Sequence, residues 1–222
     1  MLNETSLAVF SLGFALGVRH ALDPDHLVAV STIVSRNKSV VGSSVAGAFW
    51  GLGHTASLFL FGTIVLALRW TIPDGFVATA EKAVAAMLVL LGVHAFWRAI
   101  RSSRLHIHVH THDGHRHMHI TREHQHGFHV GIKSFIVGMV HGLAGTGSLM
   151  LLVIATAPSF VAGSIYILVF GLGSIGGMLV LSTLISIPFV LSARFFQRFN
   201  HGLQFATSLL SIAFGLFWMA PH

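Results

Sequence analysis

The sequence predicts an all-α integral membrane protein with six transmembrane helices, arranged as two inverted three-helix repeats in which the first helix of each repeat is broken. Three observations predict this fold class: an apolar composition, apolar segments long enough to cross a bilayer, and motifs that recur in the second half. Of the 222 residues, 54% are hydrophobic and 9% charged, whereas soluble domains carry roughly a quarter charged residues. The mean hydropathy is +0.78, so lipid is the main solvent.

Six apolar segments are bounded by charged or turn-forming residues. Each transmembrane helix needs about 20 residues, so the chain has room for six spans and for no sizeable soluble domain. The expected spans are 6–35, 41–68, 80–99, 131–157, 161–191 and 201–220. They divide the chain into a first three-helix repeat (1–100), a histidine-rich loop (101–130) and a second three-helix repeat (131–222).

Basic residues predict the orientation of the spans. Ten Lys and Arg residues lie in or beside the first, third and fifth connections, whereas only Arg69 and Lys82 lie on the other side. By the positive-inside rule, the odd-numbered connections are cytoplasmic and both termini face outside a cell membrane. Because the charges that make up the net +6 are spread singly along span ends, we expect no nucleic-acid partner. Cysteine is absent, which excludes disulfides and thiolate metal ligands.

Three short motifs recur at an almost constant offset. The pairs are Gly17-x-x-His20 with Gly138-x-x-His141 and Phe96-Trp97 with Phe217-Trp218 at 121 residues, and Trp50-Gly-Leu-Gly53 with Phe170-Gly-Leu-Gly173 at 120. Any one match alone is better explained by the general likeness of Gly- and Leu-rich helices. Because each half has three spans, the second copy must enter the membrane in the opposite sense, as in many transporters.

The first span contains the motif His20-Ala-Leu-Asp-Pro-Asp-His26. Ionisable groups in an apolar span cost several kcal/mol unless they are paired or bound, so they indicate function. On an unbroken helix the two histidines would point roughly 120° apart and could not bind one ion. Pro24 breaks the helix, and Asp23 is predicted to cap a second half-helix. For Asp23 the capping role and a ligand role are equally supported.

Four further histidines or histidine groups lie outside this motif. His141 is the repeat equivalent of His20, and the glycines after it are expected to weaken the helix there. His54 lies inside the second span, where a metal-site role competes with a hydrogen bond to Thr55 or a carbonyl. His94, near the cytoplasmic end of the third span, is expected to be interfacial. The loop from His106 to His129 holds ten of the seventeen histidines, which predicts weak binding of borderline metals by a disordered segment.

These residues predict a permease that moves a divalent metal ion by alternating access. Imidazole and carboxylate ligands without thiolate favour nickel or cobalt over copper(I) and exclude zinc poorly. Binding should weaken below about pH 6, because a protonated imidazole cannot ligate. An exporter with the same site, an intramembrane metalloenzyme and a metal sensor are the alternatives. The chain lacks a His-Glu-x-x-His arrangement, so an enzyme is disfavoured and no organic cofactor is expected.

The same residues resemble a known family. The motif from His20 to His26 is similar to the His-x4-Asp-His signature of the nickel/cobalt transporter superfamily, and Trp50-Gly-Leu-Gly-His54-Thr resembles its second motif. The six-span layout and the motif at His141 resemble the UreH-like branch. The resemblance implies that His20, Asp25 and His26 recognise Ni²⁺ or Co²⁺, with Asp23 and His54 in support. It also implies uptake towards urease or other nickel-enzyme maturation proteins.

Overall fold

The computed structural model describes residues 4–37, 39–69, 72–103, 111–112, 115–116, 127–144 and 159–220. Helices make up almost all of this part of the chain. Their bounds are α1 (Glu4–His20), α2 (Pro24–Val34), α3 (Val40–Leu68), α4 (Asp74–Ser103), α5 (Gly127–Ala144), α7 (Phe160–Phe195) and α8 (Gln197–Met219). Two short antiparallel strands, β1 (Thr111–His112) and β2 (His115–Arg116), lie between α4 and α5.

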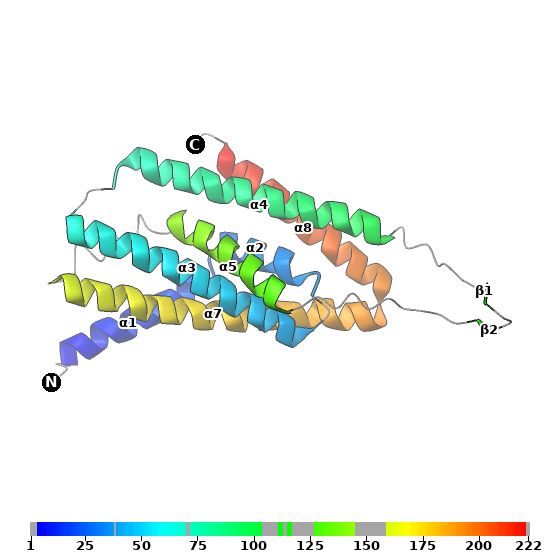
Figure 1. Ribbon diagram of the computed structural model, residues 1–222, viewed down its shortest axis with the longest axis horizontal. Helices are drawn as coiled ribbons and strands as arrows, with labels where there is room; N and C mark the ends of the chain where they lie inside the picture. The colour runs from blue at the N-terminus through cyan, green and yellow to red at the C-terminus, as the bar shows by residue number, and fades with distance from the viewer. Residues whose placement is uncertain are drawn as a thin grey trace.

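The helices form one elongated bundle (Figure 1). The long helix α3 packs along both α5 and α7, α1 packs on α7, and α4 packs along α8. The short helix α2 lies against α7, α8 and α4. Its buried residues, including Val30 and Val34, join Trp50 of α3 and Met178 of α7 in the main apolar core. This core surrounds the start of α2, where the predicted metal ligands are.

Four described helices are long and apolar enough to cross a membrane: Val40–Leu68, Gly75–Arg101, Phe160–Phe195 and Gln197–Met219. Two shorter apolar helices, Ala8–His20 and Gly131–Ala144, accompany them. Large apolar side chains face outwards, for example Leu90, which is 69% exposed, and Leu172, which is 61% exposed. An apolar exterior around a bundle of such helices is suited to lipid. The chain is therefore an all-α membrane protein.

The predicted break in the first span is present. Helix α1 ends at His20, α2 begins at Pro24, and the intervening residues form a turn in which the amide of Asp23 donates to the carbonyl of His20 at 3.0 Å. Asp23 is the N-cap residue, with φ −62° and ψ 146°, but its side chain makes no capping hydrogen bond. The capping position was thus predicted correctly, whereas the carboxylate is used elsewhere. The corresponding break after His141 was predicted for residues outside the described part.

Close glycine contacts join the two halves in a reciprocal pattern. A Cβ on Gly17 of α1 would overlap the carbonyl of Phe170 in α7, and a Cβ on Gly138 of α5 would overlap the carbonyl of Trp50 in α3. These two contacts are equivalent under the offsets of 121 and 120 residues. The contacts of Gly53 with the Phe135 carbonyl and of Gly173 with the Phe14 carbonyl form a second such pair. Each half therefore packs its first helix against the second helix of the other half.

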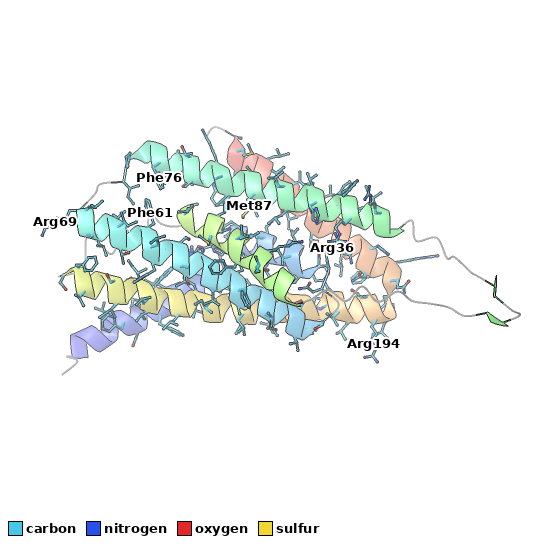
Figure 2. All side chains as sticks on the ribbon, viewed as in Figure 1. Arg36, Phe61, Arg69, Phe76, Met87 and Arg194 are labelled. Carbon is cyan, nitrogen blue, oxygen red and sulfur yellow. The ribbon has the colours of Figure 1, made fainter. Side chains whose placement is uncertain are left out.

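Basic residues near the ends of α2, α3 and α7 lie at two opposite ends of the bundle. Figure 2 shows Arg36 and Arg194 towards the end that carries β1 and β2, and Arg69 at the opposite end. The start of α1 and the end of α8 also lie towards the end opposite the strands (Figure 1). Burial and the neighbouring charge of Arg98 lower the pKa of Arg36 to about 10. Arg36 therefore remains positively charged at neutral pH.

Candidate metal site

The predicted site residues come from four helices and meet in the middle of the bundle. His20 is the last residue of α1, and Asp25 and His26 lie in the first turn of α2. His54 comes from the centre of α3, and His141 comes from the last turn of α5. Because α1 ends where α2 begins, the side chains of His20 and His26 converge, as the proline break predicted.

Three imidazoles form a first trio: His20, His26 and His54. One ligand atom from each lies within 4.8 Å of the others. The His26 ring centroid is 4.6 Å from that of His20 and 5.2 Å from that of His54, and the His20 and His54 centroids are 5.2 Å apart. Nitrogen ligands bind a transition metal at about 2.1 Å, so a small contraction would bring all three onto one ion. We call this group the first trio.

Two aspartates fix the orientation of the rings. Nδ1 of His20 donates to Oδ2 of Asp23 at 2.7 Å, and Nδ1 of His26 donates to Oδ1 of Asp25 at 3.2 Å. An ionised carboxylate only accepts hydrogen bonds, so each imidazole carries its proton on Nδ1. The lone pair of Nε2 is then free to bind a metal. Carboxylates commonly orient metal-binding histidines in this way.

A second trio adjoins the first and consists of Asp25, His26 and His141. One ligand atom from each again lies within 4.8 Å of the others. Oδ2 of Asp25 accepts a hydrogen bond of 2.7 Å from Nε2 of His141, and the His26 and His141 ring centroids are 4.1 Å apart. This contact joins the first half of the chain, through α2, to the second half, through α5. We call this group the second trio.

Several nitrogens of the site are buried without a hydrogen-bond partner among the described residues. They are Nε2 of His26, both ring nitrogens of His54 and Nδ1 of His141. The exposed fractions of His26 and His54 are 0%, and that of His141 is 2%. A buried polar group without a partner costs about 1–3 kcal/mol. A neutral imidazole has one ring nitrogen with a free lone pair, so each of these three histidines can offer one nitrogen to a bound cation.

The charge of the site matches a divalent cation. Neutral imidazoles add no charge, so Asp23 and Asp25 give the cluster a formal charge of −2 when both are ionised. A divalent ion would neutralise that charge inside the bundle, where isolated charges are costly. Trp50 and Phe170 form apolar walls, with ring centroids 5.4 Å from those of His26 and His20 respectively. The arrangement can therefore bind an unhydrated or partly hydrated metal ion.

The structure brings together all six residues that the sequence singled out. The contacts of His54 and Asp23 differ from two of those considered in the sequence analysis. His54 makes no hydrogen bond to Thr55, whose hydroxyl instead donates to the carbonyl of Gly171 at 3.1 Å. His54 thus stands inside the first trio, and Asp23 contacts His20. Sequence reasoning missed Trp50 as a wall of the site, although it lies in the recurring Trp-Gly-Leu-Gly motif.

The other histidines do not join the site in the described part of the chain. His94 is exposed on α4. Most of the loop from His106 to His129 lies outside the described residues, so its predicted disorder and metal binding stay predictions. Strands β1 and β2 pair Thr111 with Arg116 and His112 with His115 within that loop.

A helical membrane bundle with a buried cluster of histidines and carboxylates is the architecture of a metal-ion permease. A family model described as "High-affinity nickel-transport protein" (NicO) matches residues 6–217. The chain therefore belongs to this family of nickel transporters, which are membrane transport proteins and not enzymes. The resemblance seen in the sequence is confirmed.

Individual relatives agree with this assignment. The chain is 38% identical to "Urease accessory protein UreH" of Bacillus sp. (strain TB-90) over 96% of its own length and 91% of that protein. It is 27% identical to the "Chloroplast protein FOR GROWTH AND FERTILITY 2" of Arabidopsis thaliana, over 92% of this chain and 54% of the relative. A second plant protein of the same name, numbered 1, is also 27% identical, and the chain spans 56% of it. No solved structure matches the chain.

Proposed function

We propose that the protein is a nickel permease of the cell membrane that takes up Ni²⁺ through the site between α1, α2 and α3. The observation that carries this proposal is the first trio, in which the partly buried His20 and the buried His26 and His54 have ligand atoms within 4.8 Å of one another. Cobalt is the second cargo that these ligands suit. The family supports nickel, and the urease accessory protein among the relatives supports delivery towards urease or other nickel-enzyme maturation proteins.

In this proposal the histidines and the aspartates of the site have different roles. While the ion occupies the first trio, His20, His26 and His54 bind it directly, and Asp23 and Asp25 hold the rings and supply compensating charge. This differs from the expectation that His20, Asp25 and His26 ligate the ion with His54 in support. The reason is geometric, because each carboxylate is hydrogen-bonded to an imidazole while both nitrogens of His54 are free of such bonds.

We propose that six spans form two inverted repeats, 1–100 and 131–222, which rock about this site in alternating access. The reciprocal glycine contacts of α1 with α7 and of α5 with α3 support the repeat. The end that carries Arg36, Arg194 and the histidine-rich loop, residues 101–130, is cytoplasmic in this proposal, and both termini are outside. The positions of Arg36 and Arg194 towards one end of the bundle and of Arg69 at the other support this topology.

Nickel accumulation tests the function and its direction. Cells that express the chain should accumulate more radioactive nickel than cells without it, whereas an exporter would lower accumulation. His54→Ala should abolish the gain, because the first trio loses one of three ligands. His94→Ala is the matched control, since His94 is an exposed histidine of a neighbouring helix. Normal accumulation by the His54→Ala variant would refute the assignment of the ion to the first trio.

A further inference from the structure

His26 belongs to both trios of the site. Its ring centroid lies 4.6 Å from that of His20 on one side and 4.1 Å from that of His141 on the other. The two trios are separate groups, because the five donor residues do not all lie within 4.8 Å of one another. His26 is therefore the point at which two possible metal positions meet.

The repeat gives the two positions a direction. His20 and His141 are equivalent under the offset of 121 residues, and an inverted repeat is related by an axis in the membrane plane. In the proposed inverted repeat, that axis relates His20 to His141. The ring of His26 lies beside both rings, so the series His20, His26, His141 begins in the first half of the chain and ends in the second.

We infer that the transported ion occupies the two trios in turn, and that His26 passes it from His20 and His54 to Asp25 and His141. This inference rests on the proposed function. Because the two positions share His26, one ion is held at a time. In the second position the ion takes the place of the hydrogen bonds that Asp25 makes to Nδ1 of His26 and Nε2 of His141. Each of these nitrogens then gives up its proton and the same ring takes up a proton on its other nitrogen, so no net proton is released. The ion keeps its charge throughout, and no electron is transferred.

The two positions offer the ion different sets of ligands. The first position offers three neutral imidazoles, and the second offers two imidazoles and a carboxylate. Borderline metals such as nickel accept both donor types. Because Asp25 joins α2 to α5 through its hydrogen bond with His141, binding of the ion by Asp25 changes the contact between the two halves. Occupancy of the second position is thereby coupled to the rocking movement that alternating access requires.

Nickel binding to the purified full-length protein in detergent separates the two positions. Wild-type protein should bind one Ni²⁺. His54→Gln removes a ligand from the first position only and His141→Gln from the second only, so each should weaken binding by no more than about tenfold. His26→Gln and the double variant His54→Gln/His141→Gln should weaken it by at least about 100-fold. Both single variants should nevertheless lose nickel accumulation, because the pathway needs both positions.

X-ray absorption at the nickel edge identifies which position each variant retains. His141→Gln should hold nickel with three imidazoles, and His54→Gln with two imidazoles and a carboxylate. Size-exclusion chromatography selects variants that are folded and monodisperse, and His94→Gln controls for the loss of a histidine elsewhere.

Three results would overturn either this inference or the proposed function. Loss of binding in either single variant to the level of His26→Gln would show one composite site and overturn the inference. Normal accumulation by His141→Gln would also overturn it, because the second position would then not be on the pathway. A wild-type protein that binds no nickel and changes no nickel accumulation would instead overturn the proposed function itself.

Discussion

The contact between α1 and α7 at Gly17 allows a sharp test of how packing positions the site. A Cβ on Gly17 would overlap the carbonyl oxygen of Phe170 and lie 2.9 Å from its carbonyl carbon. Ordinary van der Waals contact begins at 3.4 Å, so the carbon alone requires a shift of 3.4 − 2.9 = 0.5 Å. The oxygen is closer still, so clearing it requires a shift of more than about 1 Å, because backbone atoms cannot rotate aside.

Gly17→Ala should therefore affect both stability and transport. Overpacking costs about 1–3 kcal/mol, and the higher helix propensity of alanine returns about 0.5–1 kcal/mol, which leaves a net loss of about 1–2 kcal/mol. His20 follows Gly17 by three residues, about 4.5 Å along the helix, so it moves with the contact. Binding constellations tolerate about 0.5 Å of displacement, so nickel accumulation should fall by about tenfold or more.

Thermal unfolding of purified protein, followed by the fluorescence of its four tryptophans, measures the stability, and nickel accumulation measures the transport. Gly138→Ala, the repeat equivalent, should behave like Gly17→Ala, because its Cβ would overlap the carbonyl of Trp50. Gly176→Ala is the matched control on α7, since a Cβ there meets nothing within 4 Å. The reasoning fails if Gly17→Ala unfolds at the same temperature as Gly176→Ala and accumulates nickel normally.

Three other perturbations have defined outcomes. Replacement of residues 106–126 by a short Gly-Ser linker should reduce nickel accumulation at limiting nickel but not abolish it, and complete loss would favour the sensor alternative. Asn200→Ala removes hydrogen bonds to the Phe189 carbonyl at 2.9 Å and to Ser192 at 3.0 Å, so thermal unfolding should report a loss of about 1–3 kcal/mol. Nickel binding measured by equilibrium dialysis should weaken in acid, because protonated imidazoles have no free lone pair; binding that stays unchanged down to the pH at which the protein unfolds would contradict imidazole ligation.

Much of the helical arrangement could be predicted, because it follows from local sequence. Apolar length gave the spans of α3 and α7 within a few residues, and Pro24 marked the break between α1 and α2. The third span is longer than expected, at Asp74–Ser103 instead of 80–99, because Ala, Glu and Lys continue the helix beyond its apolar core. Hydropathy reports burial in lipid and does not report where helical hydrogen bonding ends.

The sequence singled out the residues of the candidate site but could not predict the contacts among them. Spacing and the proline identified His20, Asp25 and His26, and the repeat identified His141. Whether His54 bonds to a carbonyl or faces the cluster depends on how α3 is rotated against its neighbours. That rotation is set by the close contacts of its glycines with α5 and α7, which are tertiary and leave no periodic signal. The division into two trios was unpredictable for the same reason.

The reciprocal packing of the two halves has a consequence for biosynthesis. Helix α1 packs chiefly on α7, which the ribosome produces about 140 residues later, at roughly 5–20 residues per second. The nascent α1, with His20 at its end, therefore lacks its native neighbour for several seconds or longer. A chaperone or the insertion machinery that shields α1 during that interval would raise the yield of assembled protein. Halves synthesised as separate chains should be degraded alone and should rescue each other when they are made together.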